Sequence, residues 1–200
     1  MAYIFIIYFE IQNKISHYSL FHKQSISEVE VKDYPKKRNE YIQYDNLTYL
    51  FNSDDQVERY WVNECVNKLV ELGQHNDEYL SRLEEEARVK KVISEKLETN
   101  MFAYPVTLQH YVDLFWECGS MVGAGRGSAC AGLNHYLLGI TQLDPIQHEL
   151  PYWRFLNHDR VELPDIDIDI CPSKREEIFS RIREERGDFG CIQVCTYGTE

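Results

Sequence analysis

The segment Pro164–Ile170 constrains the fold more than any other part of the sequence. After the proline it alternates strictly between acid and isoleucine, as Asp165, Ile166, Asp167, Ile168, Asp169 and Ile170. Successive side chains of a β-strand point to opposite faces, so a strand here would carry all the carboxylates on one face. Isoleucine is β-branched and favours a strand over a loop. The pattern therefore predicts a strand that is apolar on one face and acidic on the other.

This acidic face is a candidate metal site. Adjacent carboxylates repel one another unless a cation neutralises them, and their hard oxygen atoms suit Mg²⁺ or Mn²⁺. Two such ions about 3.5–4 Å apart would activate an attacking hydroxyl and stabilise a leaving pyrophosphate. A calcium-binding EF-hand loop fits less well, because Ile170 replaces its glycine and Pro172 interrupts it. The other alternative is an edge strand that its acidic residues keep soluble.

A second candidate site is the glycine-rich segment Gly123–Ser128. Its glycines permit close approach to a ligand, and we expect Ser128 to cap a helix whose free N–H groups face a phosphate. Arg126 would add charge-assisted hydrogen bonds. The segment is not a P-loop, because no lysine precedes Ser128, and it lacks the third glycine of the dinucleotide-binding fingerprint. The alternative is a tight turn that leads into a closely packed helix.

The sequence predicts four helices, the first three from apolar residues at helical spacing and the last as a charged helix. They cover Gln56 to about Leu72, Asp77–Leu97, Leu108–Cys118, and Ser173 to about Arg186. In the second helix, the charged residues Glu84–Glu86 and Lys90–Lys91 are typical of a solvated face. The apolar stripe of the third helix is typical of a core. The segments Ala2–Phe9 and Cys191–Thr196 are predicted strands.

Composition limits the class of protein. The six cysteines are scattered without a C-x-x-C pair, which indicates free thiols rather than a zinc or disulfide framework. The net charge of −12 argues against a strong grip on duplex DNA by this chain alone. No stretch reaches the roughly 20 apolar residues of a membrane span, and Ala2–Phe9 lacks the flanks of a secretory signal. We therefore expect a cytoplasmic protein with no membrane contact.

The glycine–serine turn followed by a D-x-D strand is similar to the palm of β-type nucleotidyltransferases. Further segments match in order: Leu137–Thr141, Leu143–Pro145, Arg154–Asn157, Arg160–Val161 and Thr196–Thr199. Over residues 77–200, and most closely from Gly123 onward, the chain resembles the palm of the bacterial DNA polymerase III alpha subunit, a C-family replicative polymerase. This resemblance implies an α+β fold with a small mixed sheet and flanking helices.

The resemblance also implies roles for individual residues. Gly127 and Ser128 match the pair that binds the triphosphate, and Arg126 and Arg154 match basic residues near the nucleotide phosphates. Asp165 and Asp167 match the catalytic aspartates that bind two Mg²⁺ or Mn²⁺ ions. Asp169 is not expected to be catalytic, since some family members have asparagine there. A third catalytic aspartate of the family lies on a later strand, beyond Glu200.

We therefore expect three parts: residues 1–55 as an irregular N-terminal segment, 56–118 as a helical segment, and 119–200 as a partial palm. The expected function is that of a polymerase fragment, incomplete on its own. Its partners would be deoxynucleoside triphosphates, primer–template DNA, and the remainder of the polymerase or replisome. Two alternatives remain: a compact nucleotidyltransferase acting on a small molecule or protein, and a non-catalytic binding remnant or interaction module.

Overall fold

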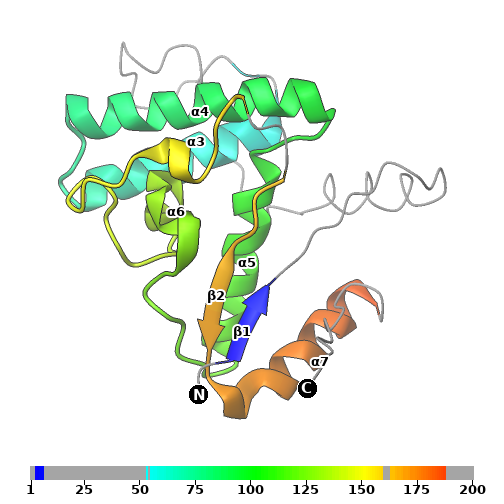
Figure 1. Cartoon of the computed structure of the whole chain (residues 1–200). Helices are drawn as coiled ribbons and strands as arrows, with labels where there is room; N and C mark the ends of the chain where they lie inside the picture. The colour runs from blue at the N-terminus through cyan, green and yellow to red at the C-terminus, as the bar shows by residue number, and fades with distance from the viewer. Residues whose placement is uncertain (1–2, 7–52, 54, 160–162, 188–200) are drawn as a thin grey trace, which may run out of the picture.

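Helices dominate the part of the chain that the structure describes. The computed structural model describes residues 3–6, 53, 55–159 and 163–187. The longer helices are α3 (Gln56–Glu71), α4 (Asp77–Leu97), α5 (Ala103–Glu117) and α7 (Arg175–Arg186), and α6 (Leu133–Leu137) is a short one. Among the described helices, none is long and apolar enough to cross a membrane. Helices α3 and α4 occupy one end of the molecule, α7 occupies the other, and α5 runs between them (Figure 1).

Side-chain caps explain where the first two helices begin. The side chain of Asp55 accepts a hydrogen bond from the backbone N–H of Glu58, and that of Asn76 accepts from the N–H groups of Glu78 and Tyr79. Each cap satisfies donors that a helix N-terminus leaves free. The predicted helices over Gln56 to about Leu72 and over Asp77–Leu97 are both confirmed.

Helix α5 begins earlier than the predicted Leu108, at Ala103. Its extra first turn includes Pro105, a residue that interrupts a helix when it lies further inside. In the first turn, however, the N–H that proline lacks has no helical partner to lose, so the helix accommodates it. The predicted apolar stripe of this helix is confirmed as core: Tyr111, Val112, Leu114 and Phe115 are all buried.

Helix α6 lies in the centre and contacts both α3 and α4. Around it the core is formed by large apolar side chains, among them Trp61 of α3, whose ring meets Phe102 edge-on at 5.1 Å. At the far end, α7 is joined to α5 by polar contacts. The Nε2 atom of His110 lies 2.8 Å from Glu185, and Nε of Arg186 donates to the hydroxyl of Tyr111.

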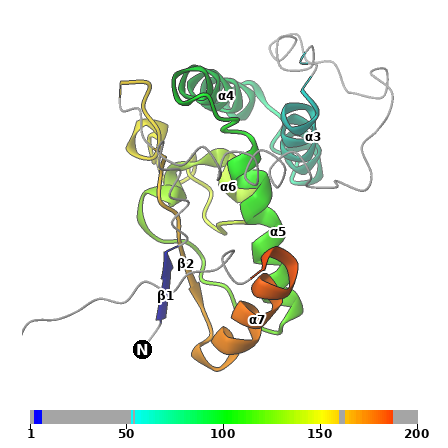
Figure 2. The same cartoon turned by 90° about the vertical axis from the view of Figure 1, so that its right-hand side faces the viewer.

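The described strands form an antiparallel ribbon beside α5 (Figures 1 and 2). Strand β1 (Tyr3–Ile6) pairs with β2 (Asp167–Ile170), with Tyr3 opposite Ile170 and Ile6 opposite Asp167. An antiparallel bridge joins Val122 to Ile170 as well. All strand pairing within residues 3–6, 53, 55–159 and 163–187 is antiparallel, so the mixed palm sheet is not shown there. The predicted strand Cys191–Thr196 lies outside the described residues.

Two boundaries differ from the sequence prediction. Strand β2 begins at Asp167, so Asp165 precedes the strand instead of forming its first position. The last helix is preceded by a 3₁₀ turn, η5 (Pro172–Lys174), and α7 itself begins at Arg175. Proline fixes the backbone at the start of that turn, which explains why the chain tightens before the α-helix begins.

Candidate active site

The structure brings the glycine-rich turn against the aspartate strand. The backbone N–H of Gly123 donates to the carbonyl of Asp169 at 2.9 Å. Four residues later, Gly127 adopts a φ of 64°, and a Cβ atom placed on it would lie 3.2 Å from Oδ2 of Asp167. Only glycine adopts this backbone conformation readily. The two motifs, far apart in the sequence, therefore form one site in which a carboxylate faces the turn.

Burial alternates along the aspartate segment as the sequence predicts. Ile166, Ile168 and Ile170 are buried, whereas Asp165 is exposed and Asp167 and Asp169 are half-buried. The hydroxyl of Tyr104 donates to the carbonyl of Pro164 at 2.7 Å and so anchors the chain just before Asp165. Burial raises the pKa of this hydroxyl, and the nearby charge of Asp165 raises it further. The acidic face exists, although only its last two carboxylates lie on the strand.

Arg126 lies between those two carboxylates. Its Nε atom is 3.8 Å from Oδ2 of Asp167, and its Nη1 atom is 3.6 Å from Oδ1 of Asp169. That Oδ1 atom is buried and has no hydrogen-bond partner within the described chain. The sequence placed Arg126 near phosphates but did not predict its ion pairs with the aspartates. The geometry gives Arg126 a second role, which is to neutralise the acidic face.

The helix after the turn is not the one the sequence predicted. The element is a 3₁₀ helix, η3 (Gly127–Ala131), and its N-cap is Arg126, which makes no side-chain cap bond. Ser128 therefore lies inside the first turn, and its predicted capping role is wrong. Gly132 is extended and ends the element after five residues. A short 3₁₀ helix aligns few peptide dipoles, so an anion here would depend on individual N–H groups and on Arg126.

A buried histidine supports η3 from beneath. The Nδ1–H group of His135 donates to the carbonyl of Ala129 at 2.7 Å, and the ring meets Phe155 edge-on at 4.5 Å. Burial, with a smaller effect from the charge of Lys90, lowers the pKa of His135 to about 3. The ring is therefore neutral at physiological pH. A Cβ atom on Gly132 would lie 2.5 Å from Nδ1, so the ring can reach Ala129 only past a glycine.

Two charged residues of α4 contradict the predicted solvated face. Glu86 and Lys90 are buried, at 0% and 1% exposure, and they lie beside α6 rather than in water. Burial lowers the pKa of Lys90 to about 8, although the nearby carboxylate of Glu86 acts in the opposite direction. The ammonium group lies 5.9 Å from the centre of the Trp61 ring. Because Glu86 and Lys90 belong to a run of charged residues, the sequence alone did not indicate that their side chains point inward.

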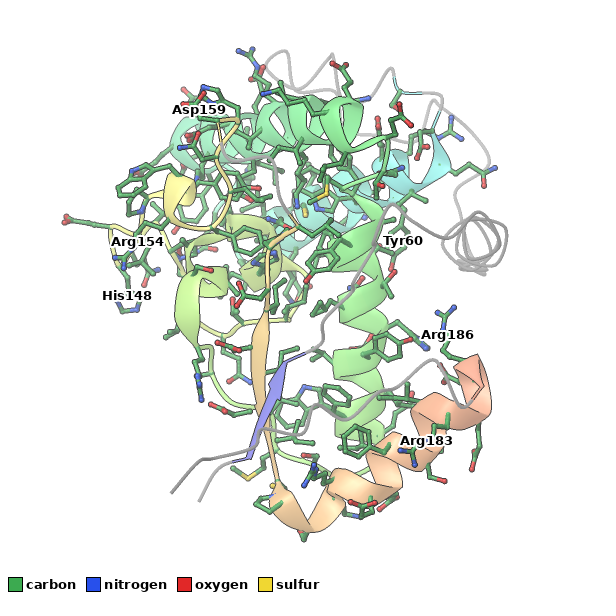
Figure 3. All side chains as sticks on the ribbon, turned by 45° about the vertical axis from the view of Figure 1, so that its right-hand side comes forward. Tyr60, His148, Arg154, Asp159, Arg183 and Arg186 are labelled. Carbon is green, nitrogen blue, oxygen red and sulfur yellow. The ribbon has the colours of Figure 1, made fainter. Side chains whose placement is uncertain are left out.

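Arg154 lies on η4 (Tyr152–Arg154), a 3₁₀ helix that contacts η3. Its side chain is exposed at the outer edge of the molecule (Figure 3). The two elements expected to bind phosphates are thus packed together, but the Arg154 guanidinium faces solvent. Its predicted role depends on a ligand that extends to that edge.

Carboxylate oxygens at this site suit a hard divalent cation, although the described residues do not form a complete ligand set. No group of three His, Cys, Asp or Glu side chains in the described part of the chain could hold a metal ion. Oδ1 of Asp169, which pairs with Arg126 but accepts no hydrogen bond within the described chain, is a position that a cation would satisfy. The described cysteines, Cys65, Cys118, Cys130 and Cys171, are free thiols, as predicted.

Comparison with known proteins gives a consistent result. A family model described as the bacterial DNA polymerase III alpha NTPase domain matches residues 55–200. A Bacillus subtilis protein named probable DNA polymerase YorL is 36% identical over 93% of this chain, and a Campylobacter jejuni DNA polymerase III subunit alpha is 32% identical over 84% of it. The Staphylococcus aureus DNA polymerase III subunit alpha is 37% identical over 75%. The chain spans only about 14–15% of the length of these relatives.

Proposed function

The chain belongs to the bacterial DNA polymerase III alpha family, and we propose that it carries part of the active site of a DNA-directed DNA polymerase. The reaction is transfer of a deoxynucleotide to a primer 3′-hydroxyl, with release of pyrophosphate. The substrates are deoxynucleoside triphosphates and primer–template DNA, and the setting is the cytoplasm. Since the chain spans about 15% of the length of its relatives, the other groups that complete the active site come from the rest of the polymerase or from replisome subunits.

One observation carries this proposal: the carboxylate of Asp167 lies so close to Gly127 that a Cβ atom added there would be 3.2 Å from its Oδ2. A nucleotidyl-transfer site needs phosphate-binding groups within reach of metal-binding carboxylates, because a bound metal would stabilise the negative charge of the nucleotide phosphates during transfer. The turn at Gly127 and Ser128 would bind the triphosphate, and the exposed Arg154 would bind its outer phosphates.

Asp165 and Asp167 would hold Mg²⁺ or Mn²⁺, which when bound would lower the pKa of the primer hydroxyl and stabilise the charge on the leaving pyrophosphate. Arg126 would then have different partners in the ligand-free and the nucleotide-bound site. Without a ligand its guanidinium pairs with Asp167 and Asp169. With a nucleotide bound it would turn to the phosphates, which bring their own negative charge.

In this proposal residues 119–200 form part of the palm, 56–118 form a helical segment that supports it, and 1–55 precede both. The support is the antiparallel ribbon of β1 and β2 with Val122 paired alongside, since a catalytic strand at the centre of a sheet needs a neighbour on each edge. A mixed sheet would require further strands outside the described residues.

Titration calorimetry with dATP and Mn²⁺ tests the proposal. The wild-type chain should bind dATP in a Mn²⁺-dependent manner, and the variant with Asp165→Ala and Asp167→Ala should lose most of that binding. Glu84→Ala with Glu85→Ala, on the outer part of α4, removes the same charge away from the site and should leave binding unchanged. Absence of heat with the wild type would favour an interaction module without nucleotide chemistry.

A primer-extension assay addresses the reaction itself. We expect the 200-residue chain alone to extend primers poorly, because its net charge of −12 disfavours binding to duplex DNA. Robust extension by this chain in Mg²⁺ would contradict that expectation.

A further inference from the structure

An ion pair behind the candidate site connects its two phosphate-binding elements. Arg82 and Glu86 are one turn apart on α4, and Nε of Arg82 lies 3.2 Å from Oε1 of Glu86. Their side chains are 15% and 0% exposed. A buried ion pair is costly to desolvate and contributes little to stability compared with apolar side chains. The buried Arg82–Glu86 pair is therefore better explained by a role in positioning other elements than by its contribution to stability.

The Glu86 carboxylate is fully hydrogen-bonded. Its Oε1 accepts from Arg82 and from the backbone N–H of Leu133 at 2.6 Å. Its Oε2 accepts from the backbone N–H of Asn134 at 2.9 Å and from the side-chain amide of Asn134 at 2.6 Å. Burial raises the pKa of Glu86, and these donors act in the opposite direction because they stabilise the charged carboxylate. Glu86 thereby fixes the start of α6, directly after η3.

The other end of Arg82 reaches two segments that are separate in the sequence. Its Nη2 atom donates to the carbonyl of Ala131 at 2.7 Å and to the carbonyl of Leu150 at 2.8 Å. Ala131 is the last residue of η3, and Leu150 lies just before η4. The guanidinium also lies 5.7 Å from the centre of the Tyr152 ring, within η4. A single side chain thus holds the end of η3 and the beginning of η4.

We propose that Arg82, oriented by Glu86, is a positioning residue that sets the distance between the turn at Gly127 and Ser128 and the helix that carries Arg154. This role rests on the proposed nucleotide-binding function. Groups that bind one triphosphate must be held in a fixed arrangement, since small displacements cost much of the benefit of preorganisation. The planar guanidinium donates in fixed directions to one carboxylate and two carbonyls, and lysine cannot reproduce that fork.

The test compares Arg82→Gln and Arg82→Lys with the control Arg88→Gln, which removes an exposed arginine from the same helix. Hydrogen exchange of backbone amides would be measured for each variant, together with calorimetric titration of dATP in Mn²⁺. Exchange reports local opening of a segment separately from global unfolding.

We expect Arg82→Gln to accelerate exchange about tenfold in residues 127–134 and 152–156 while α3 and α5 keep their protection, and to weaken dATP binding about tenfold. Arg82→Lys should restore part of the protection near η3 but not near η4. Arg88→Gln should change neither measurement.

Unchanged exchange in both segments, or an equal loss of protection in α3 and α5, would overturn the inference. Equal dATP affinity for the wild type and Arg82→Gln would also overturn it and would leave the proposed function intact. If the wild type itself does not bind dATP, the proposed function fails, and the nucleotide-positioning role of Arg82 fails with it.

Discussion

Replacing Arg126 by glutamine should change metal binding and nucleotide binding in opposite directions. In the ligand-free site the guanidinium lies 3.8 Å from Asp167 and 3.6 Å from Asp169, so its pairing with Asp167 competes with a cation for that proposed metal ligand. The same guanidinium is proposed to bind phosphate when a nucleotide is present. Removing it should therefore tighten Mn²⁺ binding and weaken dATP binding.

The geometry sets the size of the effect on Mn²⁺. The three side chains are 40%, 21% and 30% exposed, and both ion pairs are long, so solvent screens them. Partly exposed ion pairs contribute about 0.2–1 kcal/mol each. Only the pair with Asp167 involves a proposed metal ligand, so its loss corresponds to about 0.2–1 kcal/mol, or a Mn²⁺ affinity roughly 1.4- to 5-fold higher.

Calorimetric titration with Mn²⁺ alone, and then with dATP at saturating Mn²⁺, measures both effects. Arg88→Gln is the matched control, because it removes an equal charge from the exposed side of α4 and should alter neither affinity. Weaker Mn²⁺ binding by Arg126→Gln would refute the competition, and unchanged dATP binding would refute the phosphate role.

Three further predictions concern stability, measured by chemical denaturation. The pKa of His135 is about 3 in the fold and about 6.5 when unfolded, so the unfolded chain takes up the proton first as the pH falls. Between pH 7 and 5 the free energy of unfolding of the wild type should fall by about 2 kcal/mol more than that of His135→Gln. An equal dependence of unfolding free energy on pH in the two proteins would refute this. Gly127→Ala should cost about 1–2 kcal/mol from its positive φ, and more than Gly139→Ala, which shares the strain but meets no neighbour. Equal losses of stability for the two variants would contradict the proposed proximity of Gly127 to the Asp167 carboxylate. Glu86→Gln should lower the free energy of unfolding by about 3–5 kcal/mol, whereas Glu85→Gln, at an exposed position, should lower it by less than about 0.5 kcal/mol. Similar losses for the two variants would show that Glu86 is not buried as described.

Sequence reasoning performed best where a local rule decided the outcome. The bounds of α4, Asp77 to Leu97, follow from an asparagine cap and apolar spacing, both of which are visible in the sequence. The alternation of buried isoleucine and accessible aspartate after Pro164 also follows from the geometry of a strand. These features depend on neighbours within a few residues.

It performed worst where tertiary contacts decided. The inward orientation of Glu86 depends on the N–H groups of Leu133 and Asn134, which are distant in sequence. The capping role assigned to Ser128 failed because the 3₁₀ helix already begins at Gly127, with Arg126 as its N-cap. The spacing of Glu86 and Arg82, one turn apart on the buried side of α4, was a usable signal, but the surrounding charges obscured it.

The central claim is that the turn at Gly127 and the aspartates at Asp165 and Asp167 form one site for a metal–nucleotide complex. Paramagnetic broadening of amide NMR signals by Mn²⁺ with dATP tests this directly, since the ion affects only nearby nuclei. The account predicts simultaneous broadening in residues 123–128 and 165–169, abolished by replacing both aspartates with alanine. Broadening confined to one segment, or persisting in the double variant, would contradict it.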